Sequence, residues 1–252
     1  MKTKTNPWDN LGKMFKTKSP EERADSASID NIEIAWPVVL DIINKHFGKT
    51  KNLEILDHGC GTGEFINKLH SLGYKVSGQD TSKWMVEAAK SNCPKSISIY
   101  DQPLTEIEGK FDVVTSIMVM QFIRDIKQTV EQLSNSLNEK GLLIAVVFNP
   151  LFVKNFISVD VIFKDFDSKE KPEEGFLCLD EETCIPTYIR SAKEYNEVFS
   201  ENGFKDFETY KPTFTNDFAQ KYPDFISNFF AKYPEKDITK ICEHLVVAGK
   251  KH

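Results

Sequence analysis

Residues 53–63 read LEILDHGCGTG, and this stretch decides the fold. Its apolar first half predicts a short buried strand. Three alternating glycines follow, Gly59, Gly61 and Gly63, which let the chain turn sharply and let a ligand approach the backbone closely. Apolar residues then recur at helical spacing over 64–72. The stretch therefore predicts a strand, a tight turn and a helix.

The same alternation extends to both sides of this unit. Further strands are predicted at 74–80, 96–101, 111–119, 141–148, 204–210 and 244–249, and further helices at 37–47, 82–92, 123–138 and 191–203. Strands that alternate with helices form parallel sheets covered on both faces. Because parallel crossovers are right-handed, the pattern predicts a doubly wound α/β sheet.

The composition is that of a globular protein and argues against a nucleic-acid partner. Of the 252 residues, 40% are hydrophobic and 28% are charged. Acidic residues outnumber basic ones, 38 to 32, and the formal net charge of −6 disfavours binding to polyanions. The arginines, which clamp phosphates through paired hydrogen bonds, are only Arg23, Arg124 and Arg190.

The apolar runs and the cysteine positions also limit where the protein can be located and whether its cysteines can pair. No apolar run follows the N-terminal lysines, and no stretch of about 18 apolar residues predicts a membrane span. The cysteines are Cys60, Cys93, Cys178, Cys184 and Cys242. Because they are odd in number and none pair as C-x-x-C, we expect neither a disulfide framework nor a zinc site. We therefore expect a cytoplasmic protein with no membrane partner.

The glycine turn departs from two nucleotide-binding patterns. A dinucleotide fingerprint, G-x-G-x-x-G, would place its third glycine at Glu64, and a P-loop would need Gly-Lys-Ser/Thr. The polar residues at the next strand ends suit an adenosine ligand instead. Asp80 can accept hydrogen bonds from both ribose hydroxyls, and Asp101 or Gln102 can meet the adenine amino group.

Four segments in order resemble the motifs of class I S-adenosylmethionine-dependent methyltransferases. They read LEILDHGCGTGEF, VSGQDTS, IYDQPL and FDVVTSIMVMQF, and the resemblance covers residues 37–150. It implies a Rossmann-like fold with a seven-stranded sheet, mostly parallel with an antiparallel last strand. It also implies S-adenosyl-L-methionine as the cofactor and S-adenosyl-L-homocysteine as its product.

The resemblance implies roles for individual residues. Asp57 and the glycine turn would hold the methionine end, Asp80 the ribose, and Met85 the adenine, with Asp101 or Gln102 at the adenine edge. The full set implied to bind the cofactor is Asp57, Gly59, Gly61, Gly63, Asp80, Thr81, Met85, Asp101, Gln102 and Met118. Met85 and Met118 can equally be core residues, and Asp101 can equally cap a turn.

The acceptor side has weaker signals. The candidate substrate-binding residues are Trp36, Phe122, Tyr188 and Arg190. Arg190 could hold an acceptor carboxylate or phosphate, or it could be a surface arginine. We expect residues 1–36 to form an N-terminal lid on a methyltransferase domain of residues 37–252. Within that domain we expect helical or irregular cap insertions at about 151–190 and 213–240.

The chemistry implied is an in-line displacement at a sulfonium methyl group, for which alignment in a dry pocket supplies much of the rate. No catalytic residue is assigned, because a general base is needed only when the acceptor arrives protonated. No metal is expected, because the magnesium-dependent members carry acidic ligands after strands four and five and this chain lacks them.

The predicted function is methyl transfer to a small organic acceptor, by a monomer or homodimer. Three alternatives remain open at this point. The chain could bind S-adenosylmethionine without catalysis, it could methylate a nucleic acid, or it could be a nucleotide-dependent oxidoreductase. The missing third glycine argues against the last of these.

Overall fold

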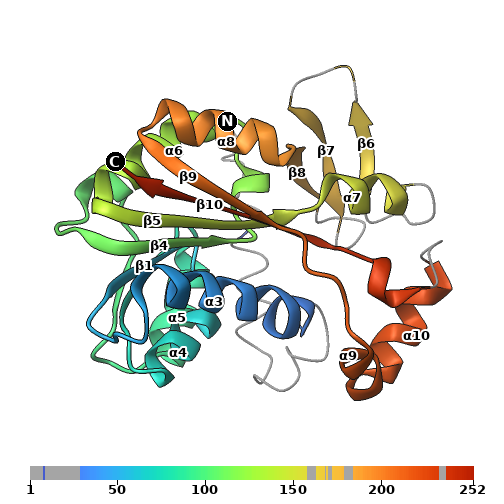
Figure 1. The fold of residues 1–252 in the computed structure, drawn as a ribbon, viewed down its shortest axis with the longest axis horizontal. Coiled ribbons are helices and arrows are strands. Elements are labelled where there is room, and N and C mark those ends of the chain that lie inside the picture. The colour runs from blue at the N-terminus through green and yellow to red at the C-terminus, as the bar shows by residue number, and fades with distance from the viewer. Residues whose placement is uncertain are drawn as a thin grey trace.

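The computed structural model describes Trp8 and residues 29–157, 163–167, 169, 172–178, 184–232 and 237–252. A seven-stranded sheet runs through the centre of this part of the chain (Figure 1). In spatial order its strands are β3 (Ser98–Tyr100), β2 (Lys75–Gln79), β1 (Glu54–His58), β4 (Phe111–Ile117), β5 (Leu137–Phe148), β10 (His244–Lys251) and β9 (Phe204–Tyr210). Only β10 is antiparallel to its neighbours, so the predicted sheet is confirmed.

Helices cover both faces of this sheet (Figure 1). One face carries α3 (Trp36–Phe47), α4 (Glu64–Ser71) and α5 (Lys83–Asn92), and the other carries α6 (Ile126–Ser136) and α8 (Ala192–Glu201). Successive strand residues point to opposite faces, so Ile55 packs with the first group and Leu56 with the second. Both faces of β1 are therefore covered, and every residue of the strand after Glu54 is buried.

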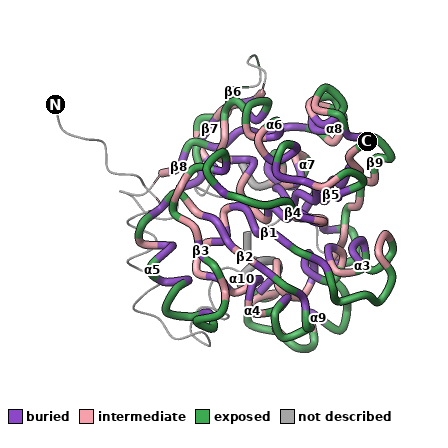
Figure 2. The backbone as a smooth tube through the Cα atoms, turned by 90° about the vertical axis from the view of Figure 1, so that its left-hand side faces the viewer, coloured by how far each residue is buried: buried purple, intermediate pink, exposed green. Residues whose placement is uncertain are grey.

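Burial follows the same plan. Figure 2 shows buried residues concentrated in the central strands, with exposed residues along the outer sides of the helices. Within β5, the seven consecutive residues 141–147 are all buried. The described helices include none with the length and apolar character needed to span a membrane.

The segment after β5 contains a second, smaller sheet. Helix α7 (Pro150–Ile157) is followed by β6 (Phe163–Asp167), β7 (Glu173–Cys178) and β8 (Cys184–Ile189), which pair antiparallel with β7 in the middle. The sequence predicts no strands here, because their alternation is short and Pro186 interrupts it. Proline is tolerated because β8 is an edge strand.

Two helices complete the cover. These are α9 (Asn216–Lys221) and α10 (Pro223–Lys232), within the segment at about 213–240 where a cap insertion is expected. Side chains of α7, α9 and the small sheet share one hydrophobic cluster, which includes Phe152, Phe163, Ile189 and Phe218. Most of the predicted N-terminal lid, residues 1–36, lies outside the described residues, so this division of the chain remains a prediction.

The hairpin formed by β7 and β8 carries a disulfide. Cys178 and Cys184 are directly opposite in the strand register and are joined, which corrects the expectation of no disulfide. The sequence did not indicate this pairing, because the hairpin that brings the two cysteines together was not predicted. The other three cysteines, Cys60, Cys93 and Cys242, are free.

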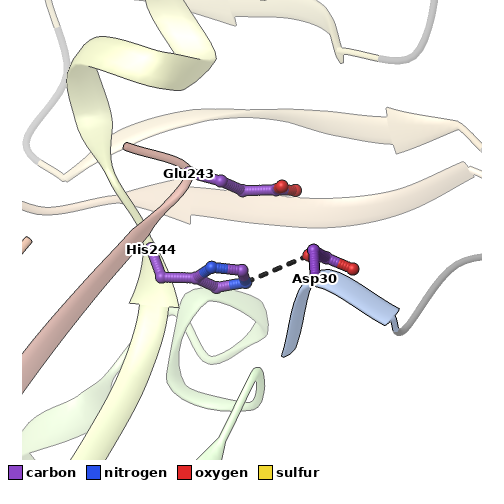
Figure 3. Close-up of side chains that lie close together, drawn as sticks. All are labelled: Asp30, Glu243 and His244. Carbon is purple, nitrogen blue, oxygen red and sulfur yellow. Dashed lines mark ion pairs between the residues drawn. The ribbon is translucent and has the colours of Figure 1, made fainter. Parts of the chain in front are cut away.

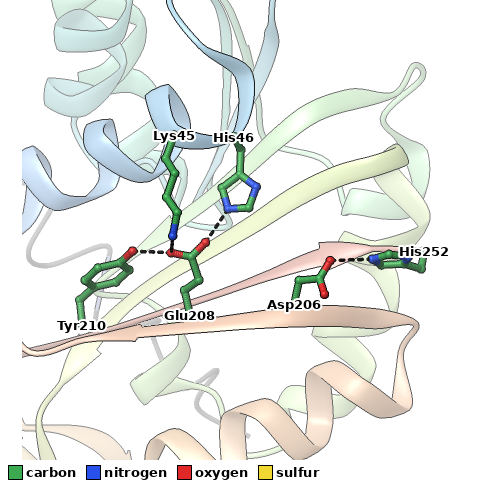
Figure 4. Close-up of polar contacts among 6 residues, drawn as sticks. All are labelled: Lys45, His46, Asp206, Glu208, Tyr210 and His252. Carbon is green, nitrogen blue, oxygen red and sulfur yellow. Dashed lines mark hydrogen bonds and ion pairs between the residues drawn. The ribbon is translucent and has the colours of Figure 1, made fainter.

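At the far edge of the main sheet, β9 is tied to α3 by one carboxylate (Figure 4). Glu208 accepts hydrogen bonds from Lys45 at 2.7 Å, from the Tyr210 hydroxyl, and pairs with His46 at 2.7 Å. Burial works to raise the pKa of Glu208, but these partners outweigh it and lower the pKa to about 2. The network therefore favours an ionised Glu208 in the folded protein.

Candidate active site

A cavity of about 510 Å³ opens at the carboxyl ends of β1, β2 and β4. Ligands of open α/β sheets bind at this edge, where the strand order reverses between β1 and β4. The cavity is lined by Trp8, Asn31, Trp36, Asp57, His58, Gly59, Cys60, Gly61, Thr62, Glu64, Phe65, Gln79, Asp80, Thr81, Met85, Ile117, Met118, Val119, Phe122 and Ile123.

Most of the predicted site residues meet here. The lining includes the predicted residues Asp57, Gly59, Gly61, Asp80, Thr81, Met85, Met118, Trp36 and Phe122. It does not include Gly63, Asp101, Gln102, Tyr188 and Arg190. The first group comes from strand ends and the turns after them, where the sequence pattern is strongest.

Asp57 is a buried carboxylate at the end of β1, only 3% exposed. The Thr115 hydroxyl, on the neighbouring strand β4, donates to its Oδ1 atom at 2.7 Å. Burial raises the pKa of Asp57 to about 7, against the hydrogen bond from Thr115, and the charge of Asp80 adds to the rise. A positively charged ligand group beside Asp57 would reverse this shift by stabilising the carboxylate.

Asp80 holds the glycine turn from the end of β2. Its Oδ2 atom accepts the backbone N–H of Gly61 and its Oδ1 atom accepts that of Ser82, both at 2.9 Å. Each carboxylate oxygen has further lone pairs that can accept a ligand hydroxyl. Asp80 thus both shapes the turn and faces the cavity.

Two of the glycines serve different purposes. Gly61 has a φ of +53°, and a Cβ atom there would meet nothing within 4 Å, so its backbone lies open beside the cavity. Gly63 has a φ of +84° and precedes α4, and a Cβ atom there would lie 2.4 Å from the Cys93 sulfur. The structure therefore assigns Gly63 to close packing of the turn, which is why it is absent from the lining.

Aromatic side chains form another wall of the cavity. Trp8 and Phe122 meet edge to face with ring centroids 4.7 Å apart, and both pack with Met85. Trp36, at the start of α3, packs against Phe65 at 5.0 Å. These rings are apolar surfaces that exclude water and can stack on a flat ligand.

Met118 lies after β4 in a strained conformation. Its φ is +57°, which is unfavourable for a bulky residue, and its N–H is fixed to the Val146 carbonyl at 2.8 Å. Such strain persists where the surroundings impose it, commonly at binding sites. The conformation places Met118 on the cavity lining, followed by the 3₁₀ turn η3 (Met120–Phe122) that carries Phe122.

Arg190 does not reach the cavity, contrary to the expectation from sequence. It is 5% exposed, and its guanidinium donates to the carbonyl of Met120 at 3.4 Å and to that of Arg124. Its donors are thus directed to the backbone around η3. Tyr188 is also buried, 8% exposed, with its ring 5.6 Å from the Arg190 guanidinium. Both residues support the segment that carries Phe122.

Asp101 and Gln102, which directly follow β3, are also outside the lining. The side-chain amide of Gln102 donates to the backbone carbonyl of Glu106 at 3.0 Å. The backbone carbonyl of Gln102 accepts a hydrogen bond from the side-chain amide of Gln79 at 3.3 Å. Gln79 is the last residue of β2, lines the cavity and is 2% exposed. A polar group thus faces the cavity next to the predicted adenine edge, but from β2.

His58 is a further polar residue that the sequence pattern did not single out. It lines the cavity, and its Nδ1 atom lies 3.1 Å from the Ser116 hydroxyl oxygen. Burial lowers its pKa to about 4, so the ring is neutral at physiological pH. Asn31 also lines the cavity and was not predicted from sequence. It is the first residue of the π-helical turn η1 (Asn31–Ala35), which leads into α3. No local sequence pattern indicates that a histidine directly before a glycine turn faces a cavity, so the position of His58 is known only from the structure.

This chain is similar in sequence and in fold to known methyltransferases. The methyltransferase domain family matches residues 33–209, well over half of the chain. A protein of Geobacillus sp. (strain WCH70) named as a methyltransferase is 31% identical over 144 residues, which is 54% of this chain and 58% of that protein. The match therefore spans less than two thirds of that relative.

Two further similar proteins carry more specific names. A ubiquinone biosynthesis O-methyltransferase of Pelagibacter ubique is 27% identical over 139 residues, 49% of this chain and 58% of its own. The crystal structure of magnesium protoporphyrin IX methyltransferase from Synechocystis, with bound S-adenosylhomocysteine, superposes with a TM-score of 0.59 at 14% identity. That superposition covers 98% of this chain and all of the other, and shows a shared fold.

The four ordered motifs, the sheet with its single antiparallel strand and the matched family domain agree with one another. This chain belongs to the class I S-adenosylmethionine-dependent methyltransferases, whose cofactor is S-adenosyl-L-methionine.

Proposed function

We propose that this protein transfers the methyl group of S-adenosylmethionine to a small organic acceptor. The observation that carries the proposal is the composition of the cavity at the carboxyl ends of β1, β2 and β4. It combines carboxylates, among them Asp57 and Asp80, with a wall of aromatic rings. A cofactor with a cationic amino acid end and a ribose suits the carboxylates, and an apolar acceptor suits the rings.

The residues of the chain would act mainly by positioning. Bound S-adenosylmethionine supplies an electrophilic methyl group on a positively charged sulfur. Asp57 would hold the ammonium group and Asp80 the ribose hydroxyls, while Trp36 and Phe122 would enclose the acceptor and exclude water. His58, being neutral, adds no positive charge to repel the sulfonium.

Two observations favour a small molecule over a nucleic acid. The net charge of −6 disfavours a polyanion, and the arginine at position 190 serves the backbone rather than a phosphate. The names of the Pelagibacter and Synechocystis proteins also denote small organic molecules. Asn31 offers one specific contact, because its buried Oδ1 atom has no hydrogen-bond partner among the described residues.

Calorimetric titration with S-adenosylmethionine and S-adenosylhomocysteine tests the first half of the proposal. We expect one site per chain with micromolar affinity for both and no binding of a nicotinamide dinucleotide. Acceptor classes, beginning with hydroxylated aromatic compounds, would then be screened by release of S-adenosylhomocysteine. Failure to bind either cofactor form contradicts the proposal. Binding without turnover of any acceptor favours the non-catalytic alternative.

A further inference from the structure

Three metal-ligating side chains meet where the N-terminal helix touches the start of the last strand (Figure 3). Asp30 directly precedes the helical turn η1 (Asn31–Ala35), and Glu243 and His244 stand at the beginning of β10. One ligand atom from each residue lies within 4.8 Å of the other two. None of the three lines the cavity, so the cluster is separate from the residues of the proposed function.

The cluster is enclosed by protein. His244 is completely buried and Asp30 is 5% exposed, while Glu243 is partly exposed. Two carboxyl groups in such surroundings need a positive partner to ionise together.

That positive partner is not supplied by a basic side chain. Within the described ranges, no lysine or arginine forms an ion pair with Asp30 or Glu243. The Nε2 atom of His244 lies 3.2 Å from Asp30 Oδ2 and points toward it (Figure 3). Yet neither ring nitrogen makes a well-formed hydrogen bond to any described residue. A fully buried imidazole in this state is uncommon and needs an explanation.

We propose that Asp30, Glu243 and His244 bind a divalent transition-metal cation of the zinc type. One imidazole nitrogen with two carboxylate oxygens is a ligand set that suits zinc and its neighbours. With bonds of about 2.1 Å, adjacent ligand atoms in a tetrahedral site lie ~3.4 Å apart. The 3.2 Å between Asp30 Oδ2 and His244 Nε2 already matches that spacing, and the third ligand needs only a small inward movement.

A cation here would fasten the N-terminal helix to the main sheet. The Glu243 carbonyl accepts the backbone N–H of Asn149 at 2.7 Å, just after β5, so the strand side of the site is fixed. Asp30, on the other side, is followed directly by Asn31, which lines the cavity. Metal binding would therefore hold Asn31 in place without touching the cofactor or the acceptor.

The sequence does not indicate this site, and the sequence analysis predicts that no metal is bound. The expected positions for acidic ligands are the turns after strands four and five. Here the ligands come from opposite ends of the chain, with no motif spacing between them, and only the folded structure brings them together.

Zinc binding by the full-length, tag-free protein tests the inference. After treatment with a chelator, the protein would be titrated calorimetrically with Zn²⁺ and, in parallel, with Co²⁺ while its visible absorption is recorded. We expect one equivalent of Zn²⁺ per chain with submicromolar affinity. Saturating Zn²⁺ should raise the melting temperature by roughly 5–10 °C, and Mg²⁺ should have no comparable effect.

Variants distinguish this site from adventitious binding. Glu243→Gln and Asp30→Asn should each weaken Zn²⁺ binding at least about 100-fold, since loss of an outer partner alone costs 10–100-fold. The matched control is Asp206→Asn, because Asp206 makes the same kind of contact with His252 at 3.1 Å but lies on the surface. It should bind Zn²⁺ as the wild type does.

The carboxylate variants are chosen because His244 is part of the core and His244→Gln could disturb folding. Metal-free Glu243→Gln should melt no lower than the metal-free wild type, since it removes one of two neighbouring acidic groups. Absence of stoichiometric binding overturns the inference, as does wild-type affinity in both carboxylate variants. Cofactor titration of the same samples is a separate readout, so this result does not depend on the proposed function.

Discussion

The two walls of the cavity are assembled in different ways. The glycine-turn wall, formed by Asp57, Gly61 and Asp80, comes from two consecutive strands and the turns that follow them. The aromatic wall, formed by Trp8, Trp36 and Phe122, comes from segments far apart in the chain. The first depends on local sequence and the second on long-range packing. Changes to the two walls should therefore have different consequences, in binding for the first and in folding or acceptor use for the second.

The largest effect is expected at the glycine-turn wall. Asp80→Ala removes a carboxylate that would accept two ribose hydroxyls, each such hydrogen bond contributing about 1.5–3 kcal/mol. We expect the affinity for S-adenosylhomocysteine to fall at least about 100-fold, measured by calorimetry. Asp101→Ala is the matched control, because Asp101 is exposed and does not line the cavity. This variant should bind S-adenosylhomocysteine as tightly as the wild type does. Equal losses in both variants would refute the assigned positions.

The aromatic wall can be tested through its support. Arg190→Ala leaves the buried carbonyl of Met120 and the partly buried carbonyl of Arg124 without their donor. We expect the free energy of unfolding in urea to fall by about 2–3 kcal/mol, with turnover of an identified acceptor reduced more than cofactor affinity. Arg124→Ala, which removes an exposed side chain, should change stability by less than about 0.5 kcal/mol. Loss of acceptor binding alone, at unchanged stability, would restore Arg190 as a direct ligand.

The pH dependence of binding sharpens the role of Asp57. Its pKa of about 7 means that much of the carboxyl is protonated below neutral pH, whereas a cationic ligand requires the ionised form. Affinity for S-adenosylhomocysteine should therefore weaken by up to about tenfold per pH unit below 7. Calorimetry in buffers of different ionisation enthalpy should show proton release on binding at pH 6. Asp57→Asn should bind weakly and without this dependence.

The smallest effect is expected far from the cavity, at Glu208. Its pKa is about 2 in the folded protein against 4.5 for the free side chain. Its contribution to stability is therefore fully present above pH 4.5 and disappears as the pH falls toward 2. Allowing for the exposed Lys45, we expect Glu208→Gln to cost about 1 kcal/mol at pH 7. Chemical unfolding at pH 7 and pH 2.5 should show this difference at the higher pH only.

Local sequence was sufficient for the main sheet and for the glycine-turn wall. Strand and helix periodicity predicted all seven strands of the main sheet, and the alternating glycines marked where the first strand ends. Asp57 and Asp80 could be placed because parallel strands bring their carboxyl ends to one edge. Boundaries differed by a few residues, as for β5, which begins at Leu137 and not at Gly141.

Other features were decided by tertiary structure alone. Arg190 became a support for η3, Gln79 and His58 entered the cavity, and Cys178 came to face Cys184, all without a distinguishing local pattern. Such contacts depend on which segments pack together and in which register. A one-residue shift in register changes every facing pair in a sheet.

Sequence by itself therefore determined the family, the order of the strands along the chain and the carboxylates beside the glycine turn. The strands and the carboxylates that follow them are marked by local spacing, which is a direct physical signal, whereas the family is marked by the resemblance of four motifs. Tertiary structure alone decided the small three-stranded sheet, the aromatic wall and the meeting of Asp30 with Glu243 and His244. These arise from side chains far apart in sequence, whose encounter depends on the packing of the whole domain.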